Sequence, residues 1–136
     1  MCPTNTPRFA DHPADSLYHG RAAPVDTVVA KQVHLWGTSK WTSDMVDSIL
    51  AAGPNFAGHY TVVATHRGAE YQAQTIIDAR TGKLLLTIAT RLGADHRLNS
   101  RLLITNPLDS KGCYPDCESC RPTYFQWDGV KLDSIW

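Results

Sequence analysis

Cysteine supplies the densest group of reactive side chains in this sequence. Cys113, Cys117 and Cys120 lie within one stretch of eight residues, and Cys2 follows the first methionine. Four cysteines in a small chain are typical of paired disulfides in an oxidising compartment. We therefore expect these four residues to form disulfides, either between two members of the cluster or between the cluster and Cys2.

The same thiolates could instead bind a structural zinc ion, with a histidine or Cys2 as the fourth ligand. Structural zinc sites usually combine two separated pairs of ligands, whereas three of the cysteines here form a single cluster. Disulfides are thus the favoured interpretation, and we expect neither a metal ion nor a cofactor.

Histidine could provide a second kind of chemistry. His59 and His66 lie in or beside one predicted strand, and His96 follows Asp95 in a polar connection. Side chains alternate between the faces of a strand, so two histidines seven positions apart point to opposite faces. The sequence also has no G-x-S-x-G motif, no H-E-x-x-H motif and no glycine-rich phosphate loop. A small hydrolase or metal-dependent enzyme using His59, His66 and His96 is therefore an alternative hypothesis, and no catalytic residue is assigned.

Aromatic residues near the C-terminus suggest a binding surface instead. In the run from Tyr124 to Trp127, Tyr124 and Gln126 share one face of a strand, and Phe125 and Trp127 share the other. Since one face is enough for the core, the other could present an aromatic row to a protein or glycan partner. We expect Tyr124 and Trp127 to be the anchors of this surface.

Strands make up most of the sequence that would position these residues. Runs of β-branched and alternating apolar residues predict strands at 25–35, 58–65, 71–78, 83–88, 101–105, 123–127 and 130–135. The Asp128-Gly129 pair between the last two predicts a hairpin. Short links elsewhere favour antiparallel pairing, because parallel neighbours need long crossover connections.

One helix is predicted, from Trp41 to Ala52. Met45, Val46, Ile49 and Leu50 form a single apolar stripe along it, and Gly53-Pro54 ends it. The sequence therefore predicts an α+β fold: a mostly antiparallel sheet of about six or seven strands, with this helix packed on one face.

Composition limits the domain organisation and the partners. The chain has 136 residues, with 13 basic and 13 acidic side chains. This length suits one domain, and a net charge of zero disfavours nucleic acid and anionic membrane surfaces as partners. The longest apolar runs are about five or six residues, too short for a transmembrane segment. Residues 1–24, which contain four prolines, are predicted to be an irregular leader or tether, and residues 25–136 a single β-rich domain.

Four stretches of the sequence form a recognisable pattern: Gly53–Thr61 (GPNFAGHYT), Ile76–Lys83 (IIDARTGK), Asn99–Pro107 and Tyr124–Leu132. These stretches resemble a family of small bacterial exported proteins and lipoproteins of uncharacterised function. The family commonly carries a Gly-Cys-Gly-x-x-Cys segment after its first strand, where this chain has no cysteine. The resemblance implies a β-rich fold and export to the periplasm or cell envelope, and it supplies no catalytic residues.

The start of the chain is consistent with that implication. Cys2 is followed by Pro3 and a polar stretch, as in a lipoprotein whose signal peptide has been replaced by one methionine, so Cys2 is a candidate site for a lipid anchor. Together these features favour a non-enzymatic exported domain that binds a macromolecular partner, as an envelope-associated recognition or inhibitor-like module. An immunity-type or purely structural protein is a further alternative.

Overall fold

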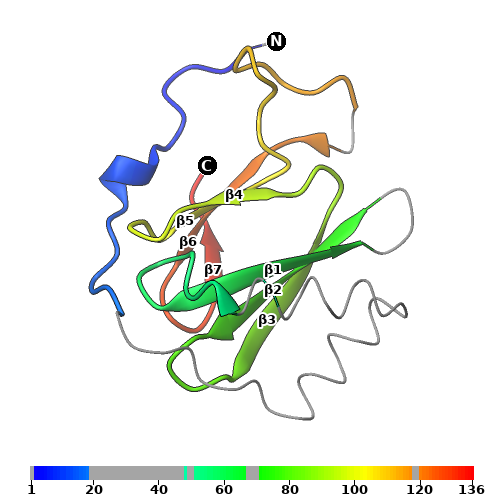
Figure 1. The fold of residues 1–136 in the computed structure, drawn as a ribbon. Coiled ribbons are helices and arrows are strands. Elements are labelled where there is room, and N and C mark those ends of the chain that lie inside the picture. Colours follow the sequence, from blue (N-terminus) through cyan, green and yellow to red (C-terminus); the bar gives the residue numbers. More distant parts are fainter. Residues whose placement is uncertain (1, 19–47, 49–50, 67–70, 118–119) are drawn as a thin grey trace.

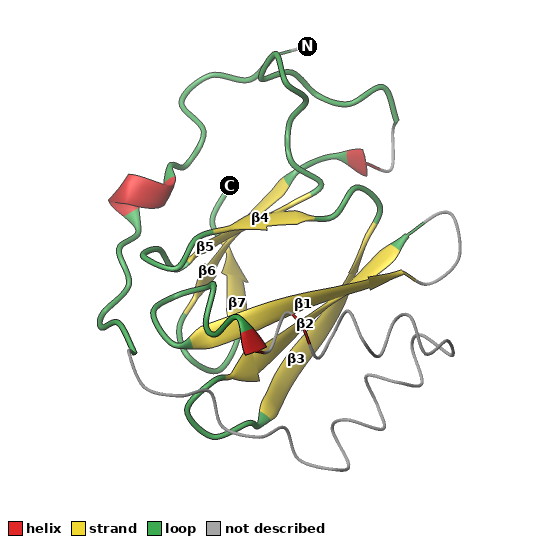
Figure 2. Ribbon diagram, viewed as in Figure 1, coloured by secondary structure: helices red, strands yellow, loops and turns green. Residues whose placement is uncertain are grey.

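The computed structural model describes residues 2–18, 48, 51–66, 71–117 and 120–136. Within these ranges the backbone is nearly all β, with seven strands in two antiparallel sheets and one short 3₁₀ turn, η1 (Phe9–Asp11). Figures 1 and 2 show the strands at the centre, with the described part of the leader, residues 2–18, running along one side. No helix in the described part of the chain is long and apolar enough to cross a membrane.

The first sheet contains three strands in the order in which they follow one another in the chain. They are β1 (Tyr60–His66), β2 (Gln72–Asp78) and β3 (Leu84–Thr90). Valine, isoleucine and threonine make up half of the residues of β1 and β2, and such side chains pack well on a pleated surface. The register places Val62 opposite Ile76, so both side chains lie on the same face.

The second sheet contains four strands, also in chain order. They are β4 (Ala94–His96), β5 (Leu102–Thr105), β6 (Thr123–Trp127) and β7 (Leu132–Ser134). The predicted hairpin is confirmed, because β6 and β7 pair across the turn at Asp128. Asp128 Oδ1 accepts hydrogen bonds from the amides of Val130 and Lys131, each at 2.8 Å. These hydrogen bonds hold the pKa of the Asp128 carboxyl below its usual value.

The two sheets share one hydrophobic core. Val62 and Ile76 of the first sheet belong to the same buried cluster as Leu103 and Trp127 of the second. Phe56, which precedes β1 and is 0% exposed, is part of this cluster. The second sheet is therefore buried against the first through one of its faces.

The expected α+β fold is wrong. The described residues form two sheets with no helix of seven or more residues, instead of one sheet covered by a helix. The physical reason is that the second sheet covers the apolar face of the first. The connection predicted over residues 89–99 also contains a strand, β4, which pairs with β5. The predicted helix over 41–52, with its stripe of Met45, Val46, Ile49 and Leu50, and the predicted strand over 25–35 fall almost entirely outside the described residues.

The GPNFAGHYT stretch forms the turn that leads into β1. Ala57 and Gly58 both have positive φ angles, 48° and 93°. The amide of Gly58 donates to the carbonyl of Leu98 at 2.7 Å, and its carbonyl accepts the amide of Tyr18 at 2.9 Å. Ahead of this turn, the side chain of Asn55 pairs with the backbone of Val62 in β1. This motif thus fastens the leader and the turn after β4 to the first sheet.

Candidate functional site

The leader covers the outer face of the second sheet, on the side opposite the shared core. Phe9 packs on a buried cluster formed by Leu102, Ile104 and Tyr124. The hydroxyl of Ser100 lies 2.9 Å from the carbonyl oxygen of Phe9 and 2.8 Å from that of His12. Residues 9–14 are therefore held on the sheet by backbone contacts as well as by the apolar side chain of Phe9.

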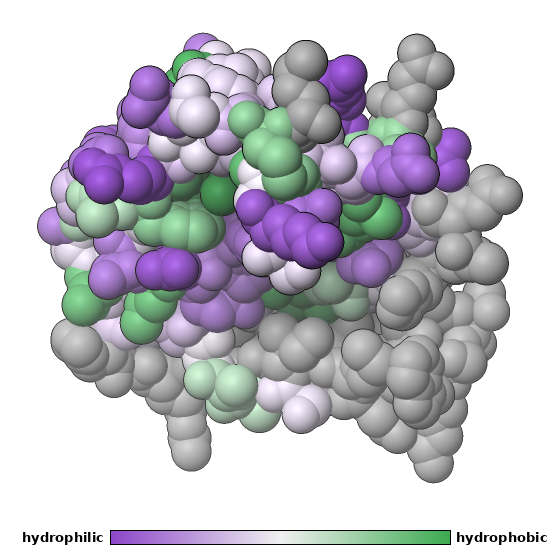
Figure 3. All heavy atoms as spheres, turned by 90° about the horizontal axis from the view of Figure 1, so that it is seen from above, coloured by the Kyte–Doolittle hydropathy of each residue, from purple (hydrophilic) through white to green (hydrophobic). Residues whose placement is uncertain are grey.

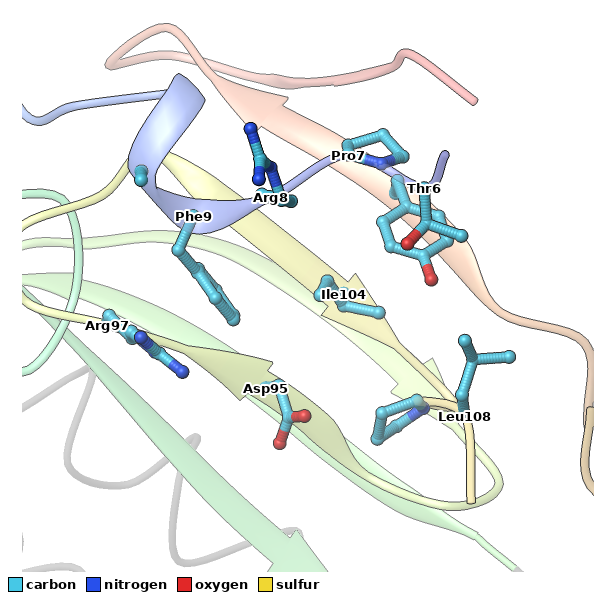
Figure 4. Close-up of a pocket in the computed structure, with 11 residues that line it drawn as sticks. Thr6, Pro7, Arg8, Phe9, Asp95, Arg97, Ile104 and Leu108 are labelled. Atoms are coloured by element: carbon cyan, nitrogen blue, oxygen red, sulfur yellow. The ribbon is translucent and has the colours of Figure 1, made fainter. Parts of the chain in front are cut away.

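A groove of about 410 Å³ lies between the leader and this face of the sheet, and we call it the leader groove. Its volume falls within the range of roughly 300–1,000 Å³ that is usual for small-ligand sites. The groove is open to solvent, and residues from both the leader and the sheet line it (Figure 4). They are Thr6, Pro7, Arg8, Phe9 and Ala10 from the leader, and Asp95, Arg97, Ile104, Pro107, Leu108 and Tyr124 from the sheet and the loop after β5.

The leader groove combines an apolar floor with a charged rim. Asp95 in β4 and Arg97 just after it are both exposed. The guanidinium of Arg97 lies over the ring of Phe9, 4.5 Å from its centroid, and Figure 4 shows Phe9 reaching from the leader toward it. Arg8 pairs with Asp11 at 3.2 Å on the surface, a pair that stabilises little. The guanidinium of Arg97 and the carboxylate of Asp95 thus border a hollow whose floor is apolar.

Tyr124 lies at the floor of the leader groove and is only 2% exposed. Its hydroxyl forms a hydrogen bond with the side chain of Thr6, and its ring meets that of Trp136 edge-on at 5.2 Å. Burial raises the pKa of Tyr124 above its ordinary value of 10.0, Tyr114 nearby acts in the same direction, and the hydrogen bond with Thr6 acts against it. Tyr124 is therefore a neutral hydrogen-bonding phenol that the leader covers.

The titration of Tyr124 gives a test of this arrangement. We expect the phenol signal of Tyr124 in a ¹³C NMR pH titration to move at a pH above 10.0, the ordinary pKa of tyrosine. Thr6→Val should raise this pKa further, because the hydrogen bond that favours the phenolate is lost. The contribution of neutral Tyr124 to the free energy of unfolding should have its full value below pH 10.0. It should fall as the pH rises through the pKa of the folded state. A pKa that does not respond to Thr6→Val would contradict the contact.

Trp127 points the other way, into the core between the sheets. It is 1% exposed and meets the ring of Tyr60 edge-on at 5.3 Å. Tyr124 and Trp127 therefore do not anchor an exposed aromatic row, contrary to the expectation from the sequence. The reason is that both faces of β6 are covered, one by the leader and the other by the first sheet. Seen from above, hydrophobic side chains form separate patches among hydrophilic ones on the described part of the surface (Figure 3).

The structure does not bring the candidate histidines into one described site. His59 lies 3.4 Å from the carboxylate of Asp78, and its ring contacts that of Tyr60 at 4.0 Å. His96 donates a hydrogen bond to the carbonyl of Asn55 at 3.1 Å, and burial lowers its pKa. His66 pairs with Gln72 at the far end of β1. Among the residues that the structure describes, no group of three or more His, Cys, Asp or Glu side chains could hold a metal ion.

The expected disulfides are confirmed. Cys2 pairs with Cys113 across 111 positions, and Cys117 pairs with Cys120 across three. All four thiols are used, so the zinc alternative has no free thiolate. The sulfur of Cys2 also cannot carry a thioether-linked lipid while it is bonded to Cys113.

Sequence reasoning missed the leader groove because its walls are far apart in the chain. The sequence signal that could have indicated the groove is Phe9, because a large apolar residue within a polar, proline-containing leader predicts that the leader packs on the domain. Asp95 and Arg97 stand in a segment without strand periodicity, and only the pairing of β4 with β5 places them beside the leader.

Comparison with known proteins finds no relative for this arrangement. The chain matches no protein-family model, no curated protein and no solved structure.

Proposed function

We propose that this protein is a non-enzymatic exported binding domain, and that the leader groove binds an extended segment of a partner protein. The observation that carries the proposal is the groove of about 410 Å³, which has aliphatic side chains at its floor and Asp95 and Arg97 at its rim. An extended peptide presents side chains alternately to its two sides, so one side can enter the floor while the other remains at the rim.

A peptide suits the groove better than a glycan does. Sugar rings usually stack on the open face of an aromatic side chain, but the ring of Phe9 is covered by Arg97 and that of Tyr124 is buried. The remaining floor is formed by Ile104, Pro107 and Leu108, which offer aliphatic surface. Asp95 and Arg97 can then select charged side chains of the peptide, because opposite charges at a rim favour one orientation over others.

Two further features support export to the periplasm or cell envelope. Disulfides persist mainly in oxidising compartments, and this chain has two. The resemblance of the GPNFAGHYT and IIDARTGK stretches to small exported bacterial proteins supports the same location. We propose this location together with the binding function, and a purely structural or immunity-type role is an alternative that the following experiment tests.

The proposal is tested by panning a displayed library of random peptides against the oxidised protein. We expect enrichment of peptides with apolar residues next to charged ones, and their addition should shift the amide NMR signals of Arg97, Ile104 and Leu108. Leu108→Glu should lower the affinity for a selected peptide by about tenfold or more, since a carboxylate then stands in the apolar floor.

Leu92→Glu is the matched control, because Leu92 is exposed and does not line the groove. This variant should bind the selected peptide as the parent does. Selection of no peptide, or of peptides whose binding is insensitive to Leu108→Glu, would contradict the proposal. A glycan that binds the protein on an array and shifts the same amide NMR signals would assign the groove to a different class of partner. That result would also contradict the proposal.

A further inference from the structure

One disulfide joins the leader to the loop that supplies part of the floor of the leader groove. Cys2 begins the leader, and Cys113 belongs to the loop that supplies Pro107 and Leu108. Figure 1 shows the N-terminus beside this loop, which precedes β6. Cys2 is exposed and Cys113 is half-buried, so the bond is accessible to thiols in solution.

The leader is fastened much more strongly at one end than at the other. From Phe9 onward it is held by Ser100, and the amide of Arg101 donates to the carbonyl of His12 at 2.7 Å. Within the part of the chain that the structure describes, residues 3–7 make one hydrogen bond to the rest of the protein, between Thr6 and Tyr124. The Cys2–Cys113 disulfide is therefore the principal link that keeps this stretch over the groove.

We propose that the Cys2–Cys113 disulfide is a redox latch of the leader groove. While the bond is intact, Thr6 and Pro7 form one wall of the groove and cover Tyr124. When the bond is reduced, residues 2–7 leave the sheet while residues 9–14 and both sheets stay in place. The effect of this release on ligand binding rests on the function proposed above, whereas the release itself does not.

Reduction requires a dithiol reductant. One thiolate of the reductant attacks Sγ of Cys2, the S–S bond breaks, and Cys113 leaves as a thiolate that takes up a proton. The second thiolate of the reductant then attacks the mixed disulfide and releases Cys2, which is protonated. The protein gains two electrons and two protons, and the reductant becomes a disulfide.

The second disulfide offers a matched control. Cys117 and Cys120 are three positions apart in the same loop, so their bond does not connect the loop with the leader. Cys120 is 3% exposed, whereas Cys117 is exposed. The variant Cys117→Ser/Cys120→Ser keeps the latch as its sole disulfide, and Cys2→Ser/Cys113→Ser lacks the latch and keeps the control bond.

The release is measured by limited trypsin digestion and mass spectrometry, with and without dithiothreitol. Arg8 is exposed, and cleavage after it reports whether the first residues of the leader are free. In Cys117→Ser/Cys120→Ser we expect dithiothreitol to raise the rate of this cleavage about tenfold or more, as for a segment that opens locally. In Cys2→Ser/Cys113→Ser the cleavage should be fast under both conditions. Cleavage after exposed Lys131 is the internal reference and should not change.

Two results would overturn the latch. One is an unchanged rate of cleavage after Arg8 on reduction. The other is loss of far-ultraviolet circular dichroism and of buried tryptophan emission in the reduced protein, because the bond would then maintain the whole fold instead of one wall of the groove. The reduced protein should also bind a selected peptide about tenfold more weakly. Release of the leader with unchanged peptide affinity would support the latch and contradict the groove as the peptide site.

Discussion

Replacing Phe56 by alanine should lower the free energy of unfolding by about 3–5 kcal/mol, the usual cost of removing a fully buried phenylalanine. Phe56 is 0% exposed, and its ring centroid lies 6.5 Å from that of Tyr60 and 6.4 Å from that of Trp127. It therefore connects the start of the first sheet with β6 of the second. Alanine would leave a cavity where the two sheets share their core, and the surrounding side chains can fill such a cavity only in part.

The loss is measured by urea denaturation followed by tryptophan emission. Phe56→Leu should lose less than Phe56→Ala, because leucine refills part of the volume. Val130→Ala is the control: Val130 is 78% exposed in the β6–β7 turn, and its replacement should change the stability by less than about 0.5 kcal/mol. A loss of less than about 1 kcal/mol for Phe56→Ala would contradict a core shared by both sheets, given the cost expected for a buried ring.

The strands could be predicted from the sequence because their signals are local. Alternation of apolar residues and turn residues at their ends predicted 58–65 and 71–78, and the structure has β1 at Tyr60–His66 and β2 at Gln72–Asp78. The hairpin at Asp128 was equally predictable, because the carboxylate of Asp128 accepts hydrogen bonds from amides of the turn within the same short segment.

What depends on distant parts of the chain could not be predicted. The three residues of β4 have no periodicity of their own and are a strand only because they pair with β5. The division into two sheets follows from which apolar faces meet, and strand patterns alone do not decide that. Cysteine content predicted disulfides, but four cysteines allow three pairings, and the sequence did not distinguish among them.

The candidate site shows the same division. The alternation at Tyr124 and Trp127 was predicted correctly, since one faces the leader and the other faces the first sheet. Their exposure was predicted wrongly, because the leader, which lacks any periodic pattern, covers the second face of β6. A polar, proline-containing segment can therefore pack on a sheet through one residue such as Phe9, provided that its backbone finds partners such as Ser100.

Gly58→Ala should be the most disruptive small change to the attachment of the leader. Gly58 has a φ angle of 93°, a conformation that costs an L-residue roughly 1–2 kcal/mol. A Cβ at this position would also overlap the carbonyl oxygen of Ser16 and would lie 3.5 Å from the Cβ of Ala14. Relief of this overlap requires movement of the leader backbone, and overpacking of this kind typically costs a further 1–3 kcal/mol or so. We therefore expect a total loss of about 2–5 kcal/mol from these two contributions.

Gly53→Ala separates the two contributions. Gly53 has nearly the same φ angle, 91°, but a Cβ there would meet no atom of the described residues within 4 Å. It should therefore lose only the conformational part, about 1–2 kcal/mol, in the same urea denaturation experiment. The difference between the two losses in free energy of unfolding measures the cost of moving residues 14–18 away from the GPNFAGHYT turn. The amide NMR signals of the leader should shift in Gly58→Ala alone. Equal losses with unshifted leader signals would mean that the leader does not lie against Gly58. The hydrogen bond from Tyr18 to Gly58 would then not form, and the leader would lack its attachment to the first sheet.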